Sequence, residues 1–228
     1  MDIIKKISEE IGCRTSQTEA AVKLIDEGNT IPFIARYRKE ATGALNDEQL
    51  RALHERLTYL RNLEDKKAQV IASIEEQGKL TPELRAQIES AETMVLVDDL
   101  YRPYRPKRKT RATVAKDKGL EGLANIISLQ MTSTPIRTEA EKYVSTEKGV
   151  ETVDDAIAGA MDIIAENISD TADYRTKIRD LTTKKGFINT TAKDPDAESV
   201  YEMYYNFSAP ISKMTGYRTL AVNRGEKE

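Results

Sequence analysis

The sequence predicts an all-α, multihelical fold, and three observations support this prediction. Helix-forming residues are plentiful, while Gly (11) and Pro (7) are sparse among the 228 residues, a composition that favours helices. Apolar residues recur at helical spacing in most of the segments between glycines and prolines. Only residues 187–192 alternate as a strand would. We therefore expect at most one short β segment.

The first 46 residues are expected to form a separate unit of three short helices. Residues 2–12 place isoleucines at helical spacing and end at a glycine, and Thr15 or Ser16 would cap a second helix that ends at Gly28. The third helix would cover residues 29–39, with a proline in its first turn. Three short helices with tight turns are compatible with a helix-turn-helix, although plain helical bundles begin in the same way.

Residues 48–77 contain neither Gly nor Pro and predict one long helix. Asp47 is a suitable N-cap and Gly78 closes the segment. At 1.5 Å per residue the helix would be about 45 Å long, so we expect it to act as a spine. Its apolar stripe consists of Leu50, Leu53, Leu57, Leu60, Leu63, Val70, Ile71 and Ile74.

The rest of the chain reads as further helices in the same scaffold, expected to span residues 47–205, with 206–228 as a linker into a missing downstream domain. Two prolines make residues 102–111 a loop rather than a helix. A long helical stretch from Asp154 to Gly186 is expected to bend near Ser169. The other expected helices cover residues 81–91, 94–100, 113–118, 120–129, 135–143, 198–205 and 217–224.

Several classes of function lack the residues they need. No apolar run reaches the ~20 residues that span a bilayer, and a single cysteine, Cys13, favours a reducing, cytoplasmic setting. Cys13 and His54 cannot make a zinc site by themselves, and His54 is expected at the surface of the spine. The pairs Asp154–Asp155 and Asp194–Asp196 lack supporting metal ligands. We expect no catalytic residue, metal or cofactor, and therefore a non-enzymatic protein.

Positive charge is concentrated in one stretch, although the whole chain carries a formal charge of −3. Residues 101–118, here called the basic segment, contain eight Lys or Arg and one acidic residue, a net of +7. A polyanion such as nucleic acid would be expected to contact the protein there. The candidate phosphate-binding residues are Arg102, Arg105, Lys107, Arg108, Lys109 and Arg111.

The basic segment also admits a purely structural interpretation. Tyr101 and Tyr104 could stack on bases, or they could anchor the loop on the spine while the arginines pair with acidic helices. Asp98 and Asp99, just upstream, fit the second interpretation. We expect Tyr101 and Arg102 to be structural and residues 107–111 to contact phosphate.

A second group of candidates lies in the third helix and consists of Arg36, Arg38 and Lys39. They could form a recognition surface, but positions 36 and 38 do not share one helical face. The alternative is salt bridges to the spine or docking of a later module. Phe33, Ile34 and Tyr37 are expected to be core residues.

Three stretches together resemble the Tex family of transcription accessory proteins. They are Thr30-Ile-Pro-Phe-Ile-Ala-Arg-Tyr-Arg-Lys-Glu-Ala-Thr-Gly43, Asp98-Asp-Leu-Tyr-Arg-Pro-Tyr-Arg-Pro-Lys-Arg-Lys-Thr-Arg-Ala112 and Tyr217-Arg-Thr-Leu-Ala-Val-Asn-Arg-Gly-Glu-Lys-Glu228. The resemblance implies a multihelical N-terminal region with a helix-turn-helix-like element. In that family it precedes an RNase H-like YqgF domain, helix-hairpin-helix repeats and an S1 domain, which is regarded as the main nucleic-acid binder.

The resulting hypothesis is a nucleic-acid-associated scaffold of a transcription accessory factor, without enzymatic activity. Its partners would be RNA or DNA, bound weakly and without sequence specificity by this region alone, and the transcription machinery; no membrane contact is expected. The alternative is a protein-interaction scaffold that docks downstream domains or the transcription machinery without touching nucleic acid.

Overall fold

A 30-residue helix, α4 (Asp47–Glu76), organises the first half of the molecule. The computed structural model describes residues 2–106 and 108–227. They form two compact units, residues 1–105 and 106–228, and each is considered by itself. The segmentation expected from the sequence, at residues 46 and 205, stays a prediction.

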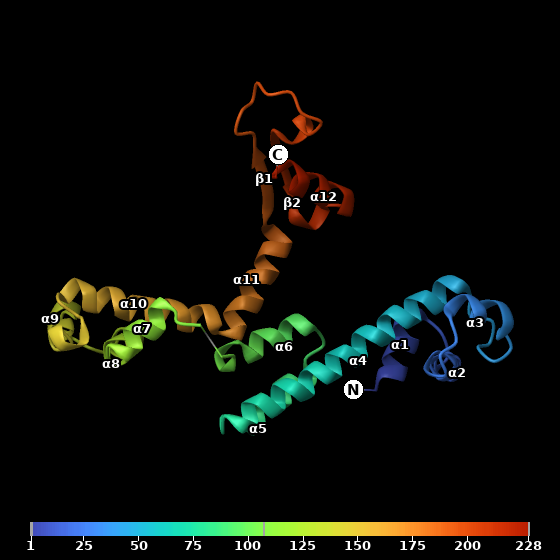
Figure 1. Ribbon diagram of the computed structural model, residues 1–228, viewed down its shortest axis with the longest axis horizontal. Helices are drawn as coiled ribbons and strands as arrows, with labels where there is room; N and C mark the ends of the chain where they lie inside the picture. The colour runs from blue at the N-terminus through green and yellow to red at the C-terminus, as the bar shows by residue number, and fades with distance from the viewer. Residues whose placement is uncertain (1, 107, 228) are drawn as a thin grey trace. The chain divides into compact units, whose positions relative to one another are not determined.

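The N-terminal unit packs five shorter helices along α4 (Figure 1). Figure 1 shows α2 and α3 against one end of α4 and α5 at the other. The predicted helices are all present in this unit. Their bounds are α1 (Ile3–Ile11), α2 (Thr15–Asp26), α3 (Ile31–Tyr37), α5 (Pro82–Ser90) and α6 (Met94–Tyr101), followed by the short 3-10 helix η1 (Arg102–Tyr104).

Helix α4 is buried along the predicted stripe, because leucines three and four residues apart share one helical face. Lys67 lies within this stripe and is only 3% exposed. Its ammonium group donates to Glu64 Oε1 and to the Glu89 carbonyl oxygen, both at 2.8 Å. A buried cation is tolerated here because each contact satisfies one of its donors.

Two helix starts differ from the sequence prediction. Asn46, rather than Asp47, caps α4: its side chain accepts from the Gln49 backbone N–H at 2.8 Å, and Gln49 accepts from the Asn46 N–H. The N-cap of α2 is Arg14, whose N–H donates to Gln17 Oε1, rather than the expected hydroxyl of Thr15 or Ser16. Asp47 instead forms a salt bridge with Arg51, four residues along.

The C-terminal unit has its core around α10 (Val153–Asp170). Three shorter helices pack against α10, as can be followed in Figure 1. Gly159 permits α10 to approach Leu120 closely, because a Cβ atom at position 159 would lie 2.3 Å from Leu120 Cδ1. The shorter elements are α7 (Arg111–Asp117), α8 (Glu121–Leu129), α9 (Ile136–Glu141) and the 3-10 helix η2 (Thr146–Lys148).

The predicted bend near Ser169 is confirmed, since α10 ends at Asp170 and α11 (Ala172–Lys185) begins after an extended Thr171. Beyond α11, β1 (Phe187–Thr191) pairs antiparallel with β2 (Asn206–Pro210), in a register that sets Phe187 opposite Pro210. The remaining elements are η3 (Glu202–Tyr204), η4 (Ile211–Lys213) and α12 (Gly216–Gly225).

The fold is predominantly α, as the sequence predicts. Strand β1 was expected, but its partner β2 was not. The predicted helix over residues 198–205 is wrong, because only Glu202–Tyr204 is helical there and the chain then enters β2. Among the described residues, no helix combines the length and the apolar character that crossing a bilayer requires.

Candidate nucleic-acid interface

The boundary between the two units falls within the basic segment, so residues of the N-terminal unit hold its first half and residues of the C-terminal unit hold its second half. In the N-terminal unit, α6 ends at Tyr101, whose hydroxyl lies 3.0 Å from Ser73 Oγ on α4. The carbonyl of Tyr104 accepts from Gln77 Nε2 at 3.0 Å. Both tyrosine rings pack against the α4 core. These contacts support the anchoring interpretation of the two tyrosines over the stacking one.

Acidic residues upstream of the segment also act structurally. Asp98 Oδ1 lies 3.2 Å from the ammonium of Lys66 on α4, and Asp99 is only 3% exposed. Arg102 and Arg105 are exposed. Among the described residues, no acidic side chain forms an ion pair with Arg105. This unit therefore presents a solvated guanidinium group next to a firmly anchored turn.

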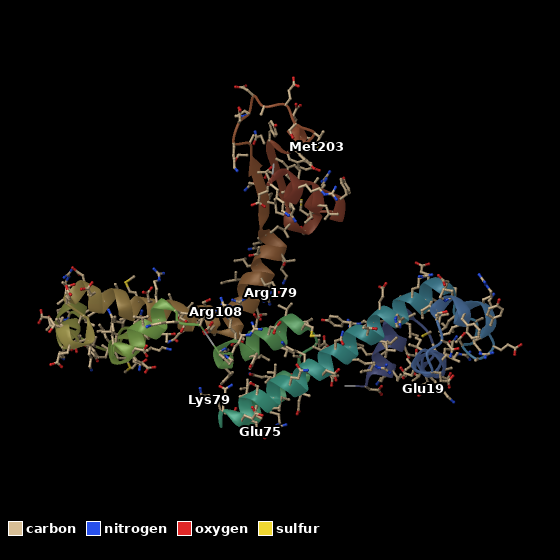
Figure 2. All side chains as sticks on the ribbon, in the orientation of Figure 1. Glu19, Glu75, Lys79, Arg108, Arg179 and Met203 are labelled. Atoms are coloured by element: carbon tan, nitrogen blue, oxygen red, sulfur yellow. The ribbon has the colours of Figure 1, made fainter. Side chains whose placement is uncertain are left out.

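The second half of the basic segment leads into α7 of the C-terminal unit. Arg108, labelled in Figure 2, and Lys109 are exposed, and no described carboxylate pairs with either. Thr110 then fixes the chain: its Oγ1 accepts from the Thr113 N–H and donates to Glu166 Oε1 on α10, both at 3.0 Å. Lys107, the remaining candidate, lies outside the described residues.

Arg111 differs from its neighbours because a carboxylate faces it. Its Nε lies 3.5 Å from Asp162 Oδ1, although the side chain remains 89% exposed. At that distance and exposure the pair contributes little to stability. A phosphate could therefore compete with Asp162 for this guanidinium group.

An open groove of about 520 Å³ runs between α7 and α10, beside this half of the segment. Lys109, Arg111 and Lys118 supply its cations, and Asp155 and Asp162 its anions. Lys118 donates to the Gly149 carbonyl oxygen at 2.6 Å. The Thr152 hydroxyl donates to Asp155 and is the main reason that the pKa of this carboxyl group lies below its usual value. The groove is thus of mixed charge: its three cations belong to the basic segment, and its two carboxylates belong to α10.

The second group of candidates surrounds the C-terminal end of α3, and all three side chains are exposed. The Arg36 guanidinium carbon lies 5.9 Å from the centre of the Tyr37 ring, and that of Arg38 lies 5.3 Å from the Phe33 ring. In the part of the chain that the structure describes, Arg36, Arg38 and Lys39 form no salt bridge to α4.

The core assignment for α3 was correct only in part. Ile34 is fully buried, but Tyr37 is 60% exposed and Phe33 is half-buried. Within this seven-residue helix, Ile31 and Ala35 pack against the core beside Ile34. In the sequence Tyr37 stands among Arg36, Arg38 and Lys39, a pattern more typical of an exposed surface than of a core.

The candidates of the N-terminal unit do not converge on one site. Helix α3 lies at the start of α4, whereas Tyr104 contacts Gln77, just past its end (Figure 1). A helix of 30 residues separates these places by about 45 Å.

The remaining polar candidates have structural partners. His54 is exposed on α4, as predicted. Asp154 forms a 2.7 Å salt bridge with Arg137, and Asp194 accepts from the backbone N–H of Asp196 in a turn. Within residues 2–106 and 108–227, no cluster of three or more His, Cys, Asp or Glu could hold a metal ion.

Comparison with known proteins gives two family matches. Residues 1–75 match the family described as "Tex-like protein N-terminal domain", and residues 131–228 match "Tex central region-like". The basic segment lies between the two matched regions.

Similar proteins match along nearly the whole chain. "Uncharacterized protein YdcI" of Bacillus subtilis is 47% identical over 227 residues, which cover 98% of this chain and 32% of that protein. "Transcriptional accessory protein Tex" of Neisseria gonorrhoeae is 42% identical, covering 100% and 30%. The human "S1 RNA-binding domain-containing protein 1" is 28% identical, covering 99% and 23%. The chain thus spans about a third or less of the length of these relatives.

Proposed function

Because the chain belongs to the Tex family, we propose that it is a nucleic-acid-associated scaffold of a transcription accessory factor. It has no catalytic role in this proposal and works in the cytoplasm. The names of two relatives support a link to transcription and to RNA, since one is called a transcriptional accessory protein and the other an S1 RNA-binding domain-containing protein.

The observation that carries the proposal is the group of exposed cations in the basic segment. Arg105, Arg108 and Lys109 have no acidic partner among the described residues, within a chain whose overall charge is negative. Cations that are not neutralised within the protein release counterions from a phosphate backbone when they bind it. This electrostatic contribution to affinity does not depend on the base sequence, so we expect RNA and DNA to bind without base specificity.

The direct test is a fluorescence anisotropy titration of the chain against labelled single- and double-stranded DNA and RNA at low salt. The variant Arg108→Glu/Lys109→Glu should bind markedly more weakly than the wild type. The matched control, Lys177→Glu/Lys193→Glu, makes the same change of charge at exposed positions of the same unit and should bind as the wild type does. Absence of binding by the wild type at low salt would refute the proposal for this region.

A second candidate function, docking of protein segments, is favoured by an apolar surface in the C-terminal unit. Tyr174, Ile178 and Leu181 are 47%, 63% and 57% exposed, and their spacing puts them on one face of α11. Exposed apolar patches of this kind often mark interaction sites.

For this second function we propose one occupant, the part of the longer family chain that lies beyond the matched region, since the relatives are about three times as long. Isothermal titration of this chain against the separately expressed remainder of a relative should show binding. Ile178→Asp/Leu181→Asp should abolish that binding without changing the affinity for nucleic acid. Equal binding by wild type and variant would rule out α11 as the docking face.

A further inference from the structure

Helix α3 exposes an aromatic pair that the core does not use. The ring centres of Phe33 and Tyr37 are 5.3 Å apart and tilted by 47°, and Tyr37 is 60% exposed. Ile34, which is fully buried, attaches the same helix to the core. A single exposed tyrosine needs no explanation; what distinguishes this one is its surroundings.

Cations are held beside both rings. Arg36 lies 5.9 Å from the centre of the Tyr37 ring and Arg38 5.3 Å from that of Phe33, within the range of a cation–π contact. Lys39 follows directly and is exposed. No described carboxylate pairs with these three cations. Their positive charge is therefore available to an anion beside the rings. We call Phe33, Arg36, Tyr37, Arg38 and Lys39 the aromatic–arginine patch.

The turn after α3 is anchored from inside the protein. Thr42 is fully buried, and its hydroxyl donates to the Arg38 carbonyl oxygen at 3.2 Å. The side-chain amide of Gln17 donates to the carbonyl oxygens of Thr42 and Gly43, at 3.2 and 2.8 Å. Gly43 has φ 59° and leaves no space for a Cβ atom, which would lie 2.8 Å from Gln17 Nε2. The backbone of Arg38 is thus fixed before any ligand binds, which lowers the entropic cost of binding.

We propose that the aromatic–arginine patch binds an unpaired stretch of nucleic acid, with a base stacked on Tyr37 and neighbouring phosphates on Arg36, Arg38 and Lys39. Every base has a π-face, so aromatic rings next to cations recognise single strands without sequence preference. A duplex keeps its base faces inside the stack and could use only the cations. This inference rests on the proposed function and adds to it a substrate class, single-stranded nucleic acid, and a site separate from the basic segment.

The test uses the absence of tryptophan from the chain. A Tyr37→Trp variant has one indole at the patch, and its fluorescence should be quenched saturably by a 12-nucleotide oligo(dT), because a stacked base quenches the indole. Tyr217→Trp, at a position that is 66% exposed in the wild type, is the control and should show no quenching. Binding of the same oligonucleotide without quenching at position 37 would overturn the inference.

Affinity gives the second readout. Loss of one stacked base costs about 1–3 kcal/mol, or roughly 5- to 150-fold in affinity. Tyr37→Ala should therefore weaken oligo(dT) binding by a factor in that range and leave the affinity for a duplex of equal length unchanged. Tyr37→Phe, which keeps the ring, should bind as the wild type does, and Tyr217→Ala should have no effect.

Two results separate this inference from the proposed function. If oligo(dT) binds, and Arg108→Glu/Lys109→Glu weakens it while Tyr37→Ala does not, the proposed function stands and the patch is refuted. If the wild type binds neither single strands nor duplex at low salt, both are refuted.

Discussion

The hydroxyl group of Tyr101 lies 3.0 Å from Ser73 Oγ, which ties the start of the basic segment to the spine helix α4. The neighbouring Tyr104 carbonyl is held by Gln77 from the same end of that helix. Of the two interpretations that the sequence left open for these tyrosines, the contacts favour anchoring over stacking.

Removing the Tyr101 hydroxyl tests this anchoring. Tyr101→Phe should reduce the free energy of unfolding by about 0.5–1.5 kcal/mol, the net value of one hydrogen bond. Affinity for nucleic acid should not change. Urea unfolding of Tyr101→Phe, Ser73→Ala and the double variant would show whether the two effects are coupled. Additive effects would mean that the contact does not stabilise the protein.

The stripe of α4 should dominate the stability of the N-terminal unit. Leu63→Ala removes a fully buried side chain and should cost about 2–5 kcal/mol. Leu181→Ala, at a position that is 57% exposed on α11, is the matched control and should change the free energy of unfolding by less than about 0.5 kcal/mol. Chemical denaturation measures both, and similar losses would contradict the burial described here.

The close approach of α10 to Leu120 requires Gly159. Gly159→Ala would bring a methyl group 2.3 Å from Leu120 Cδ1, and overpacking of this kind costs about 1–3 kcal/mol. Gly216→Ala, where a Cβ atom meets nothing within 4 Å, is the control and should be neutral or slightly stabilising. Thermal unfolding of the two variants measures both effects. A Gly159→Ala variant more stable than the wild type would contradict the tight packing of α10 against Leu120.

Acid should weaken the junction between α2 and α4. Arg61 makes two contacts with Asp26, at 2.7 and 2.8 Å, and this hydrogen bonding lowers the pKa of Asp26 below its usual value. A lowered folded-state pKa gives stability that is present above the unfolded pKa, ~3.9. That stability is lost as the pH falls through the folded-state pKa.

The pair is half-exposed, so it should contribute about 0.2–1 kcal/mol. Asp26→Asn should accordingly lower stability at pH 7 by that amount and flatten the decline between pH 5 and pH 3. Urea unfolding across this range measures it. An unaltered pH dependence would mean that Asp26 is not linked to folding.

Local patterns in the sequence predicted the helical fold well, because helix formation depends on neighbours three and four residues apart. The α4 stripe and the bend after Asp170 are examples. Strand β2 was missed because its structure depends on pairing with β1, across a connection that local propensity does not register. The burial of Lys67 could not be predicted for a similar reason, since one of its partners is a carbonyl group 22 residues away.

The candidate site was predictable as a charge pattern but not as a geometry. The excess of cations in residues 101–118 identified the basic segment. The sequence could not show that Asp162 faces Arg111 across the α7–α10 contact. The spacing of Tyr37 from Phe33 fits a buried face, and only the charged neighbours of Tyr37 indicate the exposed position that the structure shows.

The salt dependence of binding tests the central claim most directly, that exposed cations of the basic segment contact phosphates. The slope of log affinity against log salt should become shallower by about 0.9 on duplex DNA for each phosphate contact that is lost. Arg108→Gln/Lys109→Gln should therefore reduce the slope by about 1.8 relative to the wild type, on the same basis. Lys177→Gln/Lys193→Gln should leave it unchanged. Equal slopes for the wild type and Arg108→Gln/Lys109→Gln would contradict the account.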